Sequence, residues 1–279
     1  MRSKMTTTQS LKKPTILDLP YEADAVHSLL LDLKLRHFDE KLTEDLIEMT
    51  PGEREPLLRG LYKWATIEIS ERESARIASR IRFSRFKRIQ TIDAFDFDHS
   101  KATQDLKKNY LILHASVSSA NLPSAVFSGN AGLGKTHLAR ALGYAACQKG
   151  LSTLFITAAE MVNRLCAAQK SLNIENELNK YRRPQVLIID ELGYVTLDNQ
   201  ASNLFFQVIS ARHDQSLGTI ATTNIPFGKW NQIFANDAIA HVIVDRLVNE
   251  TEIFYMSGKP RLQNLSCITR AQKIRRWRT

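Results

Sequence analysis

The sequence has little cysteine, no long apolar run and no export signal. Its three cysteines, Cys147, Cys166 and Cys267, show neither a pairing pattern nor the spacing of metal ligands, so neither a disulfide framework nor a zinc module is indicated. No stretch approaches the ~20 apolar residues that a membrane-spanning helix needs. The N-terminal region, which contains Thr6–Ser10 and the pair Lys12-Lys13, lacks the apolar core of a secretion signal. These absences favour a protein of the reducing cytoplasm.

Glycine is also scarce, and five of the eleven glycines fall between residues 129 and 150. The first three belong to a match to the phosphate-loop pattern G-x-x-x-x-G-K-[ST], which reads Gly129, Asn130, Ala131, Gly132, Leu133, Gly134, Lys135 and Thr136. A predicted buried strand (125–128) precedes the loop and a predicted helix (137–149) follows it. Backbone N–H groups and the helix dipole then surround an anion. The pattern predicts an ATP site, with Lys135 at the β- and γ-phosphates and Thr136 as a ligand of Mg²⁺.

A second apolar segment ends in two acidic residues. Residues 186–189 (Val-Leu-Ile-Ile) are wholly apolar, which is typical of a central parallel strand that is buried on both faces. Asp190 follows, where a carboxylate can hold Mg²⁺ opposite Thr136. Glu191 stands one residue further, where it can activate water for attack on the γ-phosphate. A hydrolase needs this glutamate and a small P-loop kinase does not; the alternative is that Glu191 is an ordinary surface acid.

Two further residues are candidates for catalysis. Asn224 follows a third predicted strand (218–223), and its amide could position the attacking water, although an Asn-Ile-Pro string also initiates turns. Arg246 lies near the end of a predicted helix (237–248), where it is a candidate arginine finger. A solvated helix arginine is the alternative. The predicted catalytic residues are therefore Glu191, Asn224 and Arg246.

Positive charge is in excess and unevenly distributed. Of the net charge of +9, residues 72–88 contribute +6 and residues 259–279 contribute +7, which leaves −4 for the rest of the chain. Two basic clusters favour a polyanion, most simply nucleic acid, although two solvated faces would have the same composition. The sequence contains neither a zinc-ligand set nor a clear helix-turn-helix, so base-specific recognition is not indicated.

The first hundred residues have the periodicity of helices. A capping box at Thr50–Glu53 opens a helix that we expect to continue to about Lys87. Its apolar face is predicted to contain Leu57, Leu61, Trp64 and Ala65. At 3.6 residues per turn, four basic residues share a sector of about 80° on this helix, namely Arg72, Arg76, Arg80 and Lys87. The predicted surface for double-stranded DNA consists of these four together with Arg82, Arg85 and Arg88.

From about residue 104, helical and strand patterns alternate. A helix (104–119) precedes the strand before the loop, and further strands are predicted at 153–157, 185–190, 218–223 and 251–256. The alternation predicts an α/β fold, a three-layer P-loop domain with its ligand at the carboxyl ends of a parallel sheet. We expect an N-terminal all-helical domain for DNA binding and assembly (1–98), an ATPase domain (99–258) and a basic tail (259–279), with no C-terminal helical lid. The linker Thr91–Phe97 carries aromatic side chains that could cover the nucleotide base.

Four motifs together resemble the IstB-like ATPases, helper proteins of bacterial insertion sequences in the DnaA/DnaC clade of the AAA+ superfamily. They are Gly129–Thr136, 190–194 (Asp-Glu-Leu-Gly-Tyr), 222–225 (Thr-Thr-Asn-Ile) and 245–247 (Asp-Arg-Leu). The resemblance covers most of the chain, and it implies an ATPase that assembles as a homo-oligomer on target DNA and stimulates a partner transposase. It also implies the roles given above for Lys135, Thr136, Asp190, Glu191, Asn224 and Arg246.

The resemblance is incomplete at the C-terminus and leaves alternatives open. Relatives often end in Gly-x-Ser-Tyr-Arg, where this chain has Gly258–Arg261, so Arg261 is given no nucleotide-sensing role. A DnaC-like helicase loader would share the ATPase core. A DnaA-like initiator is disfavoured, because the chain after Gly258 is too short for a DNA-reading domain. A nucleotide-gated DNA scaffold with negligible turnover would also fit the motifs.

Overall fold

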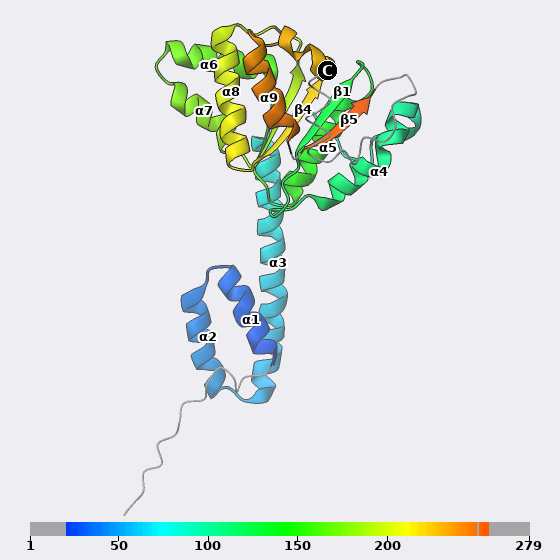
Figure 1. The fold of residues 1–279 in the computed structure, drawn as a ribbon. Coiled ribbons are helices and arrows are strands. Elements are labelled where there is room, and N and C mark those ends of the chain that lie inside the picture. The colour runs from blue at the N-terminus through cyan, green and yellow to red at the C-terminus, as the bar shows by residue number, and fades with distance from the viewer. Residues whose placement is uncertain (1–20, 250, 257–279) are drawn as a thin grey trace, which may run out of the picture. The chain divides into compact units, whose positions relative to one another are not determined.

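The structure of the protein is a computed structural model that describes residues 21–249 and 251–256 (Figure 1). Its packing forms two compact units that divide between Arg76 and Ile77, and the helix α3 (Pro51–Phe83) contributes residues to both. The sequence pattern, in contrast, places a boundary at residue 98. The predicted basic tail lies outside the described residues, and so does the prediction that no helical lid follows the ATPase domain.

Residues 84–97 pack on the second unit, which explains why the division falls before them. The backbone carbonyl of Ser84 accepts a hydrogen bond from the N–H of Phe155 at 2.8 Å, in the edge strand β2 (Thr153–Thr157). Phe86 packs against the core of this unit and Phe97 is buried in it. The apolar side chains of the segment therefore fold with the sheet.

The first unit consists of α1 (Tyr21–Asp32), α2 (Arg36–Glu48) and the first part of α3. The predicted capping box is present, since the carboxylate of Glu53 accepts hydrogen bonds from the N–H and hydroxyl of Thr50 at 2.9 and 2.7 Å. Trp64 was predicted on the apolar face, but it is 65% exposed. The buried face follows Leu58 and Ala65 (i and i+7), and Trp64 points to the other side because successive helical residues are 100° apart.

The second unit contains a five-stranded parallel sheet in the order β2-β3-β4-β1-β5. The other strands are β1 (Ala125–Gly129), β3 (Val186–Leu192), β4 (Gly218–Thr223) and β5 (Glu252–Met256). The five predicted strands are confirmed to within two residues at each end. Since all strands run in one direction, the carboxyl ends of β1, β3 and β4 meet at one edge, which we call the carboxyl edge. The amino ends of the strands form the opposite, amino edge.

Helices cover both faces of this sheet and make a three-layer α/β fold (Figure 1). One layer contains α4 (Lys101–Ser116) and α5 (Lys135–Gln148), with the short 3₁₀ helix η2 (Phe97–His99) before α4. The other contains α6 (Ala158–Lys170), α7 (Ile174–Arg182), α8 (Asn199–Asp214), η3 (Phe227–Gln232) and α9 (Asp237–Val248). Alternate strand residues enter the two cores: Leu187 and Ile189 pack with α8, and Ile188 packs with α5. No helix of the described residues is long and apolar enough to cross a membrane.

The helix α3 ends at Phe83, four residues before the predicted end. Ser84 is fully buried, and its hydroxyl donates to the carbonyl of Ile81 at 2.6 Å. Arg85 then adopts a left-handed conformation (φ 62°) that ends the helical path. Lys87 therefore lies outside the helix, and the prediction that it shares a helical stripe with Arg72 is wrong.

Candidate nucleotide-binding site

The glycine-rich loop lies between β1 and α5 at the carboxyl edge of the sheet, as predicted. Gly132 and Gly134 have φ angles of 81° and 82°, a conformation that glycine adopts without strain. A Cβ atom on Gly134 would lie 2.4 Å from the ring of Phe95, so a larger residue has no room there. No side chain caps the N-terminus of α5, which leaves N–H groups of its first turn for a bound anion. The loop thus has the backbone features of a phosphate site.

Lys135 extends back along the loop. Its Nζ donates hydrogen bonds to the carbonyl oxygens of Gly129 and Asn130 at 2.8 and 2.7 Å. Burial lowers the pKa of this ammonium group, and the negative charge of Asp190 acts in the opposite direction. Of the other loop residues, Asn130 and Ala131 are exposed and Leu133 packs against the core. The ammonium group is therefore held above the loop where phosphates would bind.

The predicted pair of metal-binding residues is brought together by three adjacent strands. The Thr136 hydroxyl donates to Asp190 Oδ1 at 2.7 Å, across 54 residues of sequence. Asp190 is buried at the end of β3, and its Oδ1 also accepts a hydrogen bond from the Thr222 hydroxyl of β4 at 2.6 Å. Two hydroxyl donors thus fix the orientation of the carboxylate. Thr222 is a residue that the sequence reasoning missed as part of the site.

Glu191 occupies an irregular position in β3. The β3–β4 register shifts between Ile189 and Leu192, and Glu191 has a left-handed φ of 61°, which is unfavourable for a residue with a side chain. Its backbone N–H donates to Thr222 Oγ1 at 2.9 Å, so the same hydroxyl contacts both acidic residues. The bulge leaves the Glu191 side chain exposed at the carboxyl edge while Asp190 stays buried. Backbone strain of this kind often marks functional residues.

Asn224 lies at the same edge of the sheet. It directly follows β4, the neighbour of β3, and its side chain is exposed. Thr223, the last residue of the strand, accepts a hydrogen bond from the N–H of Ile225 at 3.0 Å, which turns the chain directly after Asn224. The structure therefore places Asn224 beside the strand that ends in Asp190 and Glu191, as the order of the motifs predicts.

The oxygen atoms at this edge suit a magnesium ion. Thr136 and Asp190 supply a hydroxyl and a carboxylate within hydrogen-bonding distance of each other, and Mg²⁺ prefers oxygen ligands. Among the described residues there is no group of three or more His, Cys, Asp or Glu side chains that could hold a metal. One carboxylate and one hydroxyl agree with the usual Mg²⁺ site of nucleotide enzymes, where phosphates and water supply the remaining ligands.

The predicted linker Thr91–Phe97 contacts the start of α5. The carbonyl oxygen of Thr91 lies 2.9 Å from His137 Nε2, and the Phe95 and His137 rings are 5.0 Å apart. Phe97 is buried and packs beside Tyr110. Phe95 is therefore the aromatic residue of this segment that borders the loop. Coverage of the nucleotide base by these aromatics stays a prediction.

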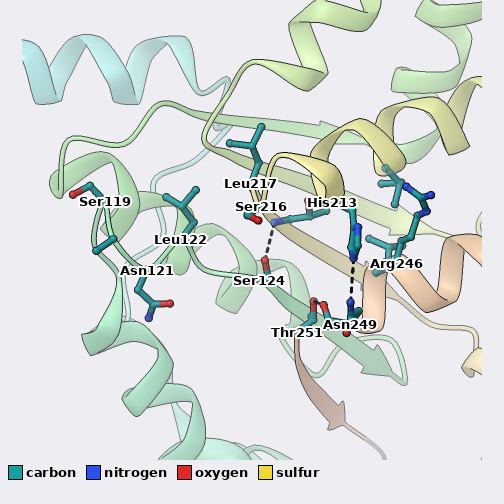
Figure 2. A pocket seen from close by; sticks show the side chains of 14 residues that line it. Ser119, Asn121, Leu122, Ser124, His213, Ser216, Leu217, Arg246, Asn249 and Thr251 are labelled. Atoms are coloured by element: carbon teal, nitrogen blue, oxygen red, sulfur yellow. Dashed lines mark hydrogen bonds between the residues drawn. The ribbon is translucent and has the colours of Figure 1, made fainter. Parts of the chain in front are cut away.

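Arg246 lies at the amino edge, away from the loop. Its Nη1 donates to Asp214 Oδ1 at 3.1 Å, and Asp214 ends α8 shortly before β4 begins. The Arg246 guanidinium carbon is 5.5 Å from the centre of the Phe206 ring. Arg246 lines a pocket of about 560 Å³ together with Ser124 and Thr251, which lie at the amino ends of β1 and β5 (Figure 2). The structure therefore does not bring Arg246 together with the loop of its own chain.

The first two basic residues predicted to bind DNA belong to the first unit. Arg72 Nε lies 2.7 Å from a carboxylate oxygen of Glu68, and Arg76 Nη1 lies 3.5 Å from one of Glu73. Arg72 also donates to the carbonyl of Leu33 at 3.2 Å. Because these charges already have carboxylate neighbours, the positive potential of this stretch is lower than its arginine content suggests.

The other five belong to the second unit. The Arg80 side chain is half-buried, and its guanidinium group lies within 4 Å of where a Cβ atom on Gly150 would be. The remaining four are exposed: Arg82, Arg85, Lys87 and Arg88. In the second unit, these four form the solvent-facing part of the predicted DNA surface.

The parallel sheet, the glycine loop at its carboxyl edge and the Thr136–Asp190 contact define a P-loop nucleotide-binding protein. Comparison with protein families gives a more specific assignment. The chain belongs to the family described as IstB-like ATP binding protein, whose profile matches residues 32–266. The resemblance seen in the sequence motifs is thereby confirmed, and ATP is the nucleotide that the family binds.

Curated relatives of similar length come from insertion sequences. The chain is 34% identical over 199 residues to the IS5376 ATP-binding protein of Geobacillus stearothermophilus. The aligned residues cover 71% of this chain and 78% of the relative. It is 31% identical over 228 residues to the IS232 ATP-binding protein of Bacillus thuringiensis, with 81% and 89% covered. Both matches extend well beyond the P-loop, so the relationship applies to most of the chain.

Solved structures confirm the AAA+ fold. The DnaC helicase loader matches with a TM-score of 0.52 and 19% identity, over 60% of this chain and 96% of that one. DnaA from Aquifex aeolicus, bound to AMPPCP, matches with a TM-score of 0.50 and 16% identity, over 60% of this chain and 49% of that one. At these identities the likeness establishes the shared fold and nothing of partners.

Proposed function

We propose that the protein is an ATP-hydrolysing regulator of transposition, which assembles on double-stranded DNA and recruits and stimulates the transposase of the same mobile element. The observation that carries the hydrolytic part is the network at the carboxyl edge, where Thr222 contacts both Asp190 and Glu191 and Thr136 contacts Asp190. The insertion-sequence relatives support the link to transposition.

Each residue of the site has a definite task in this proposal. Backbone N–H groups of the loop and the Lys135 ammonium bind the phosphates. Thr136 and Asp190 would hold Mg²⁺, which when bound would supply positive charge to the phosphates. Glu191 accepts a proton from the attacking water, and the amide of Asn224 orients that water. The strained backbone of Glu191 supports its assignment, because the bulge turns one carboxylate outward beside a neighbour that stays buried.

Arg246 acts on the ATP of a neighbouring copy of the chain. It lies at the edge of the sheet opposite to the loop, and its side chain is 27% exposed. Its ion pair is with Asp214, a side chain that is 66% exposed, and exposed pairs of this kind hold their partners weakly. Self-assembly that releases Arg246 from Asp214 would therefore require little energy. Hydrolysis at subunit interfaces would then depend on assembly.

The residues proposed to contact DNA are Arg72 and Arg76 of the first unit and, in the second unit, Arg80, Arg82, Arg85, Lys87 and Arg88. Arginine and lysine contact phosphates without reading sequence, so we expect binding with slight sequence preference and strong salt dependence. Assembly on DNA would multiply these contacts and couple the nucleotide state to residence on DNA.

Two variants test the site. Lys135→Ala should abolish ATP binding, because the ammonium group that binds the phosphates is lost. Glu191→Gln should bind ATP as the wild type does and fail to hydrolyse it. Equilibrium binding of a fluorescent ATP analogue and phosphate release measure the two steps, with and without duplex DNA. Turnover by Glu191→Gln at the wild-type rate would contradict the assigned role of this glutamate.

A helicase loader is the second candidate, because the DnaC loader has the same fold. The two functions differ in the partner that the ATP-bound protein engages on DNA. Strand transfer by a transposase of the same mobile element should rise several-fold with the wild type and not with Lys135→Ala. Stimulation of helicase loading in place of strand transfer would establish the alternative.

A further inference from the structure

The end of α3 presents an aromatic side chain to solvent among cations. Phe83 is 67% exposed, and the guanidinium carbon of Arg82 lies 5.1 Å from the centre of its ring. Arg85, Lys87 and Arg88 follow within five residues and are exposed as well. The sequence has no acidic residue between Ser74 and Ile92. Among the described residues, none of these four cations forms an ion pair.

Phe83 is held on a rigid support. The next residue, Ser84, is fully buried, and its backbone carbonyl accepts the hydrogen bond from Phe155 of the edge strand at 2.8 Å. The Ser84 hydroxyl donates to the carbonyl of Ile81 at 2.6 Å, and its N–H donates to that of Arg80 at 2.9 Å. The N–H, the carbonyl and the hydroxyl of Ser84 are thereby all held by hydrogen bonds within the second unit. The backbone that carries the ring therefore loses little conformational freedom when the ring binds a partner.

The residues after Ser84 also alternate between exposed and buried side chains. Arg85 has a left-handed φ of 62°, which is unfavourable for an arginine, and Phe86 then packs into the core beside Phe155. The strained turn keeps Phe83 and Arg85 outside while Ser84 and Phe86 are inside. Retention of strain at a solvent-exposed position is typical of functional segments.

An exposed aromatic ring among cations that form no ion pairs suits a partner with negative charge on its outside and flat apolar groups inside. Duplex DNA has this chemistry, with phosphates outside and stacked bases between them. A second copy of the same patch is disfavoured, because four like charges would face four like charges. Phenylalanine is among the side chains that enter the minor groove of bent DNA as apolar wedges, with arginine or lysine beside them.

We propose that Phe83 inserts between base pairs of duplex DNA, while Arg82 and its neighbouring cations bind the flanking phosphates. This inference rests on the proposed DNA-binding function and adds a contact with bases to the phosphate contacts. The contact would unstack one base step and bend the duplex by about 20–90°, as other apolar wedges do. A preference for easily unstacked pyrimidine–purine steps would follow without hydrogen bonds to base edges.

The test uses the full chain with ATP and a duplex that contains 2-aminopurine at a TA step and fluorophores at its ends. Three variants are compared with the wild type: Phe83→Ala, Arg82→Ala and, as a matched control, Ile112→Ala on α4, an apolar side chain that is 60% exposed. Affinity is measured over a series of salt concentrations. Fluorescence of 2-aminopurine reports unstacking, and energy transfer between the ends reports bending.

Phe83→Ala should bind about five- to 150-fold more weakly at every salt concentration, which is the effect of one lost base–aromatic contact. Its salt slope should equal that of the wild type, and the unstacking and bending signals should disappear. Phe83→Trp should restore both signals. Arg82→Ala should flatten the log–log salt slope by about 0.9 and retain the unstacking signal. Ile112→Ala should match the wild type in all measurements.

Three results would overturn the inference while duplex binding itself persists. The first is wild-type affinity and 2-aminopurine fluorescence in Phe83→Ala. The second is a loss that affects single-stranded DNA only. The third is loss of self-assembly by Phe83→Ala in the absence of DNA, which would assign the ring to a protein contact. A wild type without salt-dependent binding to any duplex would overturn the proposed DNA-binding function as well.

Discussion

Removal of the Thr222 hydroxyl should damage both the stability of the second unit and its ATPase activity. This hydroxyl donates to Asp190 Oδ1 at 2.6 Å and accepts the Glu191 N–H at 2.9 Å. Thr222→Val keeps the shape of the side chain and removes both hydrogen bonds. Thr222 is 2% exposed, so water has little access to replace them.

The magnitude follows from the two bonds. A hydrogen bond to a charged acceptor contributes about 1.5–3 kcal/mol and a bond between neutral groups about 0.5–1.5 kcal/mol. The free energy of unfolding should therefore fall by about 2–4.5 kcal/mol. With a urea dependence of about 2 kcal/mol per M, the unfolding midpoint would shift down by about 1–2 M. The loss of orientation of Asp190 and of the Glu191 backbone should lower kcat for ATP by at least about tenfold, since small misplacements of catalytic groups have effects of this size.

Thr223→Val is the matched control. Thr223 is also buried in β4, but its hydroxyl accepts from the N–H of Ile225 at 3.0 Å, donates to the carbonyl of the same residue at 3.3 Å and forms no hydrogen bond with Asp190 or Glu191. The control should lose about 1–2 kcal/mol of stability, because both of its bonds join neutral groups and one of them is long, and it should keep most of its activity. Urea unfolding followed by circular dichroism and phosphate release at saturating ATP measure the two quantities.

Equal stability and equal kcat in Thr222→Val and Thr223→Val would refute this reasoning. Such a result would mean that Asp190 and Glu191 are positioned by β3 alone. A loss of stability without a loss of activity would support the contribution of these hydrogen bonds to stability and refute their contribution to catalysis.

Two further predictions concern residues away from the loop. A mixture of Arg246→Ala and Lys135→Ala subunits should recover ATPase activity that neither variant has alone, since one supplies the loop and the other the arginine; absence of recovery in assembled mixtures would contradict action between subunits. Arg212→Met should lower the free energy of unfolding by at least about 3 kcal/mol, because the buried guanidinium satisfies the carbonyls of Tyr181 and Pro184 at 2.8 Å each. A loss below ~1 kcal/mol in urea unfolding would show that water replaces these bonds.

The sheet and the loop could be predicted from the sequence because their signals are local. Each strand is a short apolar run, and the residues that bind phosphate follow one another in Gly129–Thr136. The structure confirms the strands and places Thr136 against Asp190, as the paired motifs predict. In these segments the local pattern and the tertiary structure favour the same conformation, so neighbouring residues were sufficient for the prediction.

The end of α3 could not be predicted in this way. Between Gly60 and Lys87 the sequence has neither glycine nor proline, so no residue there breaks a helix strongly. The helix ends because Ser84 is buried and its carbonyl binds the N–H of Phe155, a strand residue far along the chain. A tertiary contact thus overrides the helical propensity of residues 84–87. The same contact is the reason why Phe83 becomes a fixed, exposed tip.

Buried polar residues were the second gap. Arg212 resembles an ordinary helix arginine in the sequence, yet it is fully buried and donates to backbone carbonyls around the amino end of β4. Burial lowers its pKa to about 9, so it still carries its charge at neutral pH. Thr222 resembles any β-branched strand residue. Their partners come from other strands and loops, and a single sequence contains no pattern that identifies them.

Arg246 shows what the geometry adds to a motif. In the sequence, Asp-Arg-Leu follows the other motifs and gives no indication of whether the arginine serves its own chain or another. The strands that separate its edge from the loop are five to seven residues long, roughly 16 Å or more at 3.3 Å per residue. No arginine side chain spans that distance across a packed sheet. If Arg246 contacts a γ-phosphate, that phosphate belongs to a second copy, and turnover must then rise with the concentration of assembled protein.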